Sequence, residues 1–517
     1  MRRFLALAVA GGVLGLPAYG QEPVSAIGWL SESLRNPPPF EITPEAPPLV
    51  PETGLGIIEK KGLGGISPDA IGLLAPSVTG FPVGMWGDLD VDEAVRLVRD
   101  FPESDVPTVR EMFHRILLAQ ANPPQGSNHT GPLLQARIDR LFEMGALDAA
   151  EALVNLDTPA SPEMFDRAFD IAILTDRTLK VCETLANAPA LTDDLSKRVY
   201  CLARSGDWNA AAITLSLGAS IGAIPREREL LLIRFLDPQM FEGAPDPAVP
   251  DPLEPMDFVL REAVFLPRPS GPLPLPYLYR DTEARAPLRA RIEASERLVK
   301  SGALPSSILF EAYRTGNPAA SGGVWGRQRA IQDMDRALES RDPARIAAAT
   351  QVAIQVMGDA GLLEAFAAEF GETLSRLPYA PAYAPVVGPV LDVVHLAGLT
   401  APDWEENATP DPRRDLARAL VRKQPPASLP EGDALVQAIT AAMAGGAPDS
   451  PQSNRLHEAL DRGNTAQALL GAMRLLSDGA AADPGRVGAG LYILRAAGQE
   501  AAARRIAVQI LLLPGAL

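Results

Sequence analysis

Residues 218–222 read Gly-Ala-Ser-Ile-Gly and match the G-x-S-x-G pattern of a serine nucleophile. In that chemistry a sharp turn between a strand and a helix exposes the serine to a histidine base, for which His395 and His457 are candidates here. The segment before Ser220, NAAAITLSL, continues an Ala-rich helix, and the sequence contains no HGGG-like segment for an oxyanion hole. We therefore predict that Ser220 lies where a helix ends beside two glycines, with a serine hydrolase as the alternative.

The other residue types that bind metals or nucleotides are sparse. His114, His129, His395 and His457 never reach the spacing at which two histidines on one helix bind the same metal. The sequence has no CxxC or HExxH motif for zinc, and neither G-x-G-x-x-G nor G-x-x-x-x-G-K-[ST] for a nucleotide. We therefore expect no metal and no cofactor.

One glutamate stands in a more specific context. The segment EAYRTGNPAAS, residues 311–321, loosely resembles the E-S-x-x-N-P-x-A-x-S signature of lytic transglycosylases. Those enzymes use one glutamate as a general acid on peptidoglycan, so the resemblance implies Glu311 as a candidate catalytic acid. Asn317 lies six residues after Glu311 instead of four, Ala312 replaces the serine, and GGVWGRQ replaces G-A-x-G-L-M-Q. The alternative is an exposed glutamate near the end of a helix, followed by a loop.

The sequence contains two cysteines, Cys182 and Cys201. Each falls in a predicted helix, and the connection TLANAPALTDD should fold the two helices back on one another. An oxidising compartment would allow the pair to form a disulfide. The alternative is that both are small buried side chains that never meet, because the helix ends are not symmetric about the turn.

The first 20 residues have the three parts of a secretory signal peptide. Arg2 and Arg3 are followed by the apolar run FLALAVAGGVLGL and then by Ala-Tyr-Gly. This pattern predicts cleavage between Gly20 and Gln21 and export to a bacterial periplasm, with a soluble N-terminal helix as the alternative. A membrane-spanning helix needs about 20 apolar residues. We find no later stretch of that kind, so we expect no integral membrane segment after cleavage.

The charge of the chain restricts its partners. The formal net charge is −17 and becomes −19 when Arg2 and Arg3 leave with the signal peptide. An acidic chain repels phosphate backbones and anionic lipid headgroups, so we expect no nucleic acid and no membrane surface as a partner.

Apolar residues at helical spacing follow one another along most of the chain, and we therefore predict an all-α fold. Asp90 and Glu93 resemble a capping box, which begins a helix. Stretches rich in proline interrupt the helical pattern, because proline stops helices and stiffens connections. The predicted segments are a signal peptide (1–20), a Pro/Gly-rich extended arm (21–85), a helical repeat block (86–236), a Pro-rich connection (237–279), a helical block (280–377), a Pro-rich connection (378–430) and a C-terminal helical repeat block (431–517).

A local pattern recurs four times, in which a helix ends at a glycine and an Ala-rich helix follows. The glycines are Gly145, Gly206, Gly463 and Gly498, and each has an alanine five residues later, at Ala150, Ala211, Ala468 and Ala503. We expect each glycine to end its helix in a left-handed conformation and each alanine to lie where two helices cross closely. The pattern resembles the helix–turn–helix unit of tetratricopeptide-like repeats, and the last two glycines are 35 residues apart, near that family's period. The resemblance implies an irregular α-solenoid of helical hairpins.

Helical solenoids hold peptides and proteins on long surfaces without catalytic groups. The expected function is therefore that of a non-catalytic binding or scaffolding protein of the bacterial cell envelope, with envelope proteins as partners. The alternative is a peptidoglycan-acting enzyme that uses Glu311 as its general acid.

Overall fold

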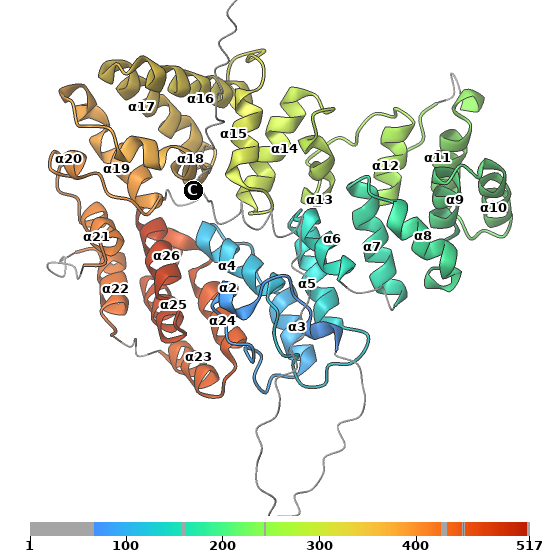
Figure 1. The fold of residues 1–517 in the computed structure, drawn as a ribbon, viewed down its shortest axis with the longest axis horizontal. Helices are drawn as coiled ribbons and strands as arrows, with labels where there is room; N and C mark the ends of the chain where they lie inside the picture. Colours follow the sequence, from blue (N-terminus) through green and yellow to red (C-terminus); the bar gives the residue numbers. More distant parts are fainter. Residues whose placement is uncertain are drawn as a thin grey trace, which may run out of the picture. The chain divides into compact units, whose positions relative to one another are not determined.

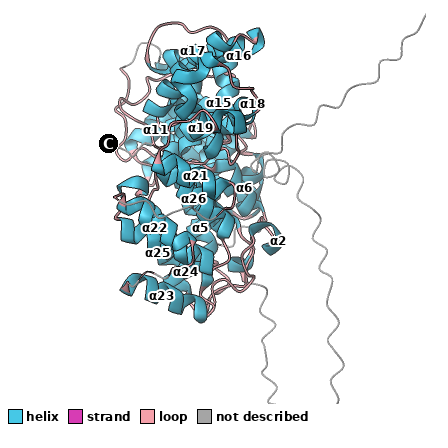
Figure 2. Ribbon diagram, turned by 90° about the vertical axis from the view of Figure 1, so that its left-hand side faces the viewer, coloured by secondary structure: helices cyan, strands magenta, loops and turns pink. Residues whose placement is uncertain are grey.

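Helices make up the regular secondary structure of the chain in the computed structural model (Figure 1, Figure 2). The structure describes residues 67–513, except for residues 157–160, 242–244, 425–431, 447 and 449. These described residues form 25 α-helices and no β-strand; their β-type contacts are two isolated bridges, Leu74–Ala119 and Asp90–Gln125. The prediction of an all-α fold is confirmed. The predicted signal peptide lies outside the described residues.

The described residues belong to one compact unit, residues 51–517. The helices of its first half are α2 (Pro76–Thr79), α3 (Val91–Arg99), α4 (Pro107–Leu118), α5 (Pro132–Glu143), α6 (Leu147–Asn155), α7 (Pro162–Leu174), α8 (Leu179–Asn187), α9 (Leu195–Arg204), α10 (Trp208–Ser220), α11 (Arg226–Leu236) and α12 (Pro255–Ala263). The remaining helices are α13 (Leu275–Leu278), α14 (Leu288–Lys300), α15 (Ser306–Arg314), α16 (Gly323–Ser340), α17 (Pro343–Asp359), α18 (Leu363–Ser375), α19 (Val387–Leu396), α20 (Pro402–Glu405), α21 (Pro412–Val421), α22 (Ala434–Met443), α23 (Pro451–Asp461), α24 (Thr465–Leu476), α25 (Pro484–Ala496) and α26 (Glu500–Leu512).

Proline begins many of these helices instead of separating them. Both segments predicted as Pro-rich connections contain helices: α12 and α13 lie within residues 237–279, and α19, α20 and α21 lie within residues 378–430. Pro255, Pro402 and Pro412 occupy the first position of α12, α20 and α21. At that position the N–H that proline lacks has no partner inside the helix, and its fixed φ already suits the helix. A high proline content therefore does not by itself predict that these two segments lack helices.

The part of the predicted arm (residues 21–85) that the structure describes is not a free extended segment. Residues 21–66 lie outside the described part, but residues 67–85 pack against α4 and α5. Asp69 is only 1% exposed, and its carboxylate accepts a hydrogen bond of 2.8 Å from the backbone N–H of Leu134, in the first turn of α5. The guanidinium of Arg137 donates to the carbonyl oxygens of Ile71, Leu117 and Ala119. These bonds fix the segment, whose composition resembles that of a loop.

The four repeated turns share one backbone geometry. Gly145, Gly206, Gly463 and Gly498 all have positive φ, between 77° and 87°. At each turn the residue after the glycine donates its N–H to the carbonyl five residues earlier, and its own carbonyl accepts from the alanine N–H four residues later. The four alanines, Ala150, Ala211, Ala468 and Ala503, are all 0% exposed. Each turn thus ends one helix and begins the next, as the pattern predicts.

A fifth copy of this turn lies at Gly361, between α17 and α18, with the same backbone hydrogen bonds. The pattern in the sequence missed it because Phe366, which is 0% exposed, replaces the alanine.

The last helices of the chain pack against the first ones. Helix α26 contacts α4, α19 and α21, and α24 contacts α3 and α4 (Figure 1). The side chain of Gln509, 1% exposed, accepts a hydrogen bond of 3.0 Å from the N–H of Thr108 at the start of α4. Arg505 forms ion pairs of 3.0 Å with Glu111 on α4 and with Glu364 on α18. Helices that follow one another in the sequence pack together. Contacts between the first and the last helices of the described chain add to this packing.

No helix among the described residues is long and apolar enough to cross a membrane.

The buried alanine of a turn should not tolerate a larger side chain. We expect Ala503→Leu to lower the free energy of unfolding by about 1–3 kcal/mol, because added methylene groups force neighbours out of a closely packed core. Ala501→Leu is the matched control, since Ala501 is exposed on the same helix. Urea denaturation measures both; equal effects of the two substitutions would contradict the proposed role of the turn alanine.

Burial of His114 should make stability depend on pH. Desolvation lowers the pKa of His114 from 6.5 to about 4, because this half-buried imidazole on α4 has its Nε2 atom shielded from solvent with no hydrogen-bond partner among the described residues. Between these values the unfolded chain binds a proton that the folded chain does not, so this contribution to stability is complete above pH 6.5 and is lost as the pH falls to 4. We expect His114→Leu to reduce the fall in melting temperature between pH 7 and pH 4.5.

The matched control for this measurement is His129→Leu, because His129 is exposed. A pH dependence of the His114→Leu variant as steep as that of the wild type would show that another group causes the acid sensitivity.

Candidate functional site

Ser220 is the last residue of α10, and the prediction of a helix end at this serine is confirmed. Its hydroxyl donates a hydrogen bond of 2.8 Å to the carbonyl of Leu217, one turn earlier in the same helix. Gly222 follows with φ of 68°, which ends the helix in a left-handed conformation. The local structure therefore lacks the strand-to-helix turn on which a G-x-S-x-G nucleophile depends.

Glu311 lies on α15 and its side chain is exposed. The buried carboxylate of this region belongs instead to Glu296 on α14, which accepts hydrogen bonds from the Tyr313 hydroxyl at 2.7 Å and from two nitrogens of Arg327 at 2.6 and 2.7 Å. Burial, and then the charge of Glu296, raises the pKa of Tyr313. This cluster joins α14, α15 and α16. Within it the Glu296 carboxylate accepts hydrogen bonds from both the Tyr313 hydroxyl and the Arg327 guanidinium.

A second buried group of charged residues surrounds His395 on α19. Its Nε2 lies 3.1 Å from a carboxylate oxygen of Glu405, and Arg422 forms an ion pair with the other oxygen of Glu405. Burial lowers the pKa of His395, and Glu405 opposes that effect. The two residues are 2% and 6% exposed. A substrate could not reach them without opening the packing of α19 against α20, so we interpret the group as structural.

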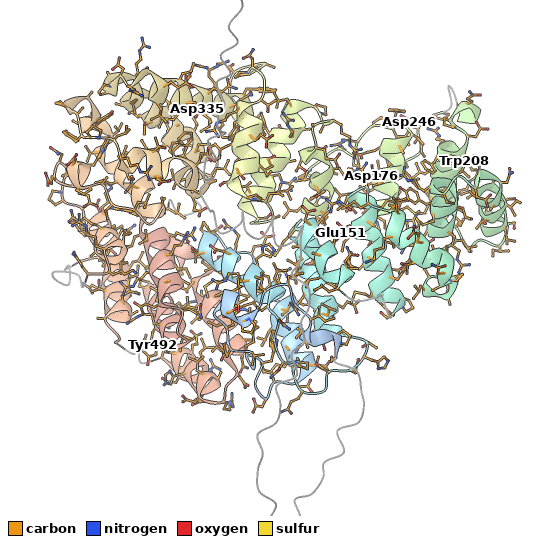
Figure 3. All side chains as sticks on the ribbon, viewed as in Figure 1. Glu151, Asp176, Trp208, Asp246, Asp335 and Tyr492 are labelled. Carbon is orange, nitrogen blue, oxygen red and sulfur yellow. A yellow bond between two sulfur atoms is a disulfide. The ribbon has the colours of Figure 1, made fainter. Side chains whose placement is uncertain are left out.

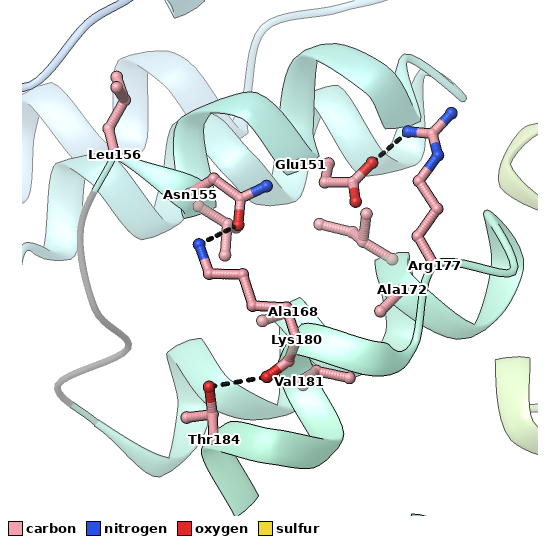
Figure 4. Close-up of a pocket in the computed structure, with 11 residues that line it drawn as sticks. Glu151, Asn155, Leu156, Ala168, Ala172, Arg177, Lys180, Val181 and Thr184 are labelled. Atoms are coloured by element: carbon pink, nitrogen blue, oxygen red, sulfur yellow. Dashed lines mark hydrogen bonds and ion pairs between the residues drawn. The ribbon is translucent and has the colours of Figure 1, made fainter. Parts of the chain in front are cut away.

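A pocket of about 320 Å³ lies between α6, α7 and α8 (Figure 4). Its apolar lining comes from small and branched side chains of all three helices. The lining residues are Glu151, Val154, Asn155, Leu156, Ala168, Ile171, Ala172, Arg177, Lys180, Val181 and Thr184. The volume is at the lower end of the range for small-molecule sites and suits one side chain of a partner or one small group.

Four polar side chains of the pocket form two pairs (Figure 4). Arg177 forms an ion pair with Glu151 and a second one of 2.8 Å with Asp148, so two carboxylates face its single positive charge. Lys180 donates a hydrogen bond of 2.7 Å to the amide oxygen of Asn155. Burial raises the pKa of Glu151, and Arg177 opposes that effect. The Lys180 ammonium thus has a neutral partner, which a stronger acceptor such as a carboxylate can replace.

Helix α8, which supplies Lys180, Val181 and Thr184 to the pocket, is joined to α9 by a disulfide. The Cys182 and Cys201 sulfur atoms are 1.99 Å apart and the two Cα atoms 5.2 Å apart. Only Val181 and Leu185 of α8 are buried, so packing contributes little to the position of this helix. The disulfide therefore holds one wall of the pocket in place.

The sequence did not point to this pocket. The lining residues come from three helices and share no spacing or motif, and Lys180 resembles any solvated lysine. Ser220, Glu311 and the paired cysteines lie on α10, α15 and α8–α9, and the structure does not bring them into one site. Within the described ranges, no group of three or more His, Cys, Asp or Glu side chains is arranged to hold a metal ion.

No family model, curated protein or solved structure matches this chain.

Loss of the disulfide should destabilise the protein around α8. The two cysteines are 19 residues apart, and closing a loop of this size stabilises a protein by about 3 kcal/mol. We expect Cys182→Ala with Cys201→Ala to lower the melting temperature, and a reducing agent to lower it in the wild type but not in this variant. Mass spectrometry of unreduced, exported protein gives the direct test; free thiols at both positions would contradict the disulfide.

Proposed function

We propose that this chain is an exported, non-catalytic binding protein of the bacterial cell envelope, and that the pocket between α6, α7 and α8 receives a partner. The observation that carries the proposal is a pocket with both apolar and polar lining beside Lys180, whose ammonium has the neutral amide of Asn155 as its hydrogen-bond partner among the described residues. A partner that fits this pocket presents an apolar side chain close to a carboxylate. Such a feature occurs at the C-terminus of a peptide and beside Asp or Glu in a flexible segment.

The chemistry of the pocket supports this choice of partner. Ala168, Ile171 and Ala172 offer an apolar surface, and burial of a partner's methyl groups there is favourable by the hydrophobic effect. A carboxylate near Lys180 forms an ion pair with the ammonium, in which donor and acceptor are both charged, and this bond is stronger than the bond to the neutral amide of Asn155. The net charge of −17 disfavours long acidic partners, so we expect one carboxylate within a segment of low charge.

Export is part of the proposal and rests on the N-terminal 20 residues, whose charged, apolar and small-residue parts favour a signal peptide. Disulfides form and persist in the periplasm, and the cysteine pair of α8 and α9 agrees with such a compartment. The relation to tetratricopeptide-like repeats is likewise a proposal, which the common geometry of the four glycine turns supports.

The alternative of a peptidoglycan-acting enzyme rests on Glu311. A general acid at neutral pH usually needs a buried or acidic environment that raises its pKa, whereas the Glu311 side chain is exposed. No specific observation favours the alternative, and it stays a prediction from the sequence.

A photoreactive amino acid at Thr184, on the rim of the pocket, tests the proposed site in living cells. We expect a discrete adduct with an envelope component, and about tenfold less of it when Lys180→Glu is also present. Because Lys180 is exposed, the lost ion pair and the new repulsion together cost only about 1.4 kcal/mol, which corresponds to this tenfold loss.

Two controls make this experiment specific. Lys300→Glu makes the same change of charge on α14 and should leave the Thr184 adduct unchanged. The photoreactive amino acid at Val352, exposed on α17, should not give the same adduct. An adduct that forms equally with Lys180→Glu, or no adduct at Thr184, would contradict the proposed site.

A further inference from the structure

Helix α10 differs from its neighbours because it has no charged residue. Residues 208–223 read WNAAAITLSLGASIGA, whereas 21% of the whole chain is Asp, Glu, Lys or Arg. One side of the helix packs against α9 and α11 through Ala211, Leu215 and Gly218. A helix that has no charged residue and is rich in apolar ones is normally buried. The other side of α10 is nevertheless exposed.

The exposed side carries a ridge of large apolar side chains, spaced four residues apart. Ile213 is 70% exposed, Leu217 is 56% exposed and Ile221, the residue that caps the helix, is 65% exposed. Isolated exposed apolar residues are common on protein surfaces, but a continuous helical ridge of this kind marks an interaction site. Trp208, 51% exposed, begins the same helix (Figure 3).

Small side chains lie directly beside the ridge. Ala212, Ser216 and Ser220 are all exposed and follow the same four-residue spacing. Because these side chains are small, their row can act as a groove beside the ridge, into which a ridge of matching spacing can pack. A helix that carries both a ridge and a groove can pack against a copy of itself, because the ridge of each copy can lie in the groove of the other.

We infer that this face of α10 is the contact between two copies of the chain, arranged antiparallel about a two-fold axis. In such an interface the same patch occurs on both partners, so the patch must be complementary to itself. The ridge of each copy lies in the groove of the other, and Leu217, in the middle of the ridge, lies close to the axis.

The charges of the chain favour a second copy over an oppositely charged partner. Two copies of the mature chain, each with a net charge of −19, repel one another, and a face with no charged residue is where that repulsion is weakest. The flanking charges are also complementary when the helices are antiparallel. Asp207 lies exposed before the start of α10, where its carboxylate also accepts the N–H of Ala210, and Arg226 follows the end of the helix, with a side chain that is 67% exposed and forms an ion pair with Glu229 of the same copy. Antiparallel pairing places Asp207 of one copy at the same end as Arg226 of the other.

The area of the contact sets its strength. A standard stable interface buries about 800 Å² on each partner, and the outer side of one 13-residue helix provides less. The dimer is therefore reversible, and its population depends on protein concentration. This inference does not depend on the pocket between α6, α7 and α8, because the α10 face is a separate surface.

Sedimentation equilibrium of the full mature chain, with its disulfide intact, tests the inference over about 1 µM to 500 µM, the range of weak interfaces. The expected result is a weight-average mass that rises from the monomer towards the dimer. Leu217→Glu places two like charges near the axis and should keep the protein monomeric over the whole range. Val352→Glu, which adds a charge at an exposed apolar residue of α17, should dimerise as the wild type does.

A cysteine substitution tests the geometry. Leu217→Cys should form a disulfide-linked dimer on air oxidation, because the two introduced thiols face each other across the axis, whereas Val352→Cys should remain monomeric. A mass that stays at the monomer at every concentration would overturn the inference. So would a Leu217→Glu variant that dimerises like the wild type, or assembly beyond the dimer, since a two-fold contact closes on itself.

Discussion

The packing of α26 against α4 is the contact on which the arrangement of the other helices depends. The N–H groups in the first turn of any helix lack partners within that helix. In α4 the residue before the first turn provides no side-chain cap, and Gln509 accepts the hydrogen bond from Thr108 across 401 residues of sequence. The Gln509 side chain is 1% exposed, and this bond gives its amide oxygen a partner, which matters because an unpaired buried polar atom is costly. The bond therefore ties the start of the helical region to its end.

A similar bond fixes the segment before α3. Asp69 accepts from the N–H of Leu134 in the first turn of α5, where glycine precedes the helix and cannot cap it with a side chain. Both caps act between segments that are remote in sequence. The starts of α4 and α5 are thus places where distant segments are joined. The second of these bonds helps to explain why residues 67–85 pack against the helices in spite of a composition typical of a loop.

The pocket and the α10 face lie on helices that bury few residues against the rest of the protein. Helix α8 buries two residues and is held by the disulfide, so its pocket-facing side chains need not fill a core. Helix α10 buries three residues and leaves its apolar ridge exposed. Aromatic residues make up only 5% of the chain, and buried alanine and glycine allow helices to approach closely. Small residues allow helices to pack closely inside the hairpins, and we propose that they allow close packing on the outer side of α10 as well.

Local features of the structure were determined by the sequence itself. The four glycine turns, the start of α3 after Asp90 and the end of α10 at Ser220 follow from hydrogen bonds between residues at most five positions apart, and such bonds depend on neighbouring residues alone. The tertiary structure decided the rest. It made Glu296 the buried carboxylate and left Glu311 exposed, began helices at prolines that we had interpreted as breaks, and gathered the pocket from three helices without a shared motif. Whether two residues hundreds of positions apart come into contact depends on the directions of all the helices between those residues. A local sequence pattern does not determine these directions.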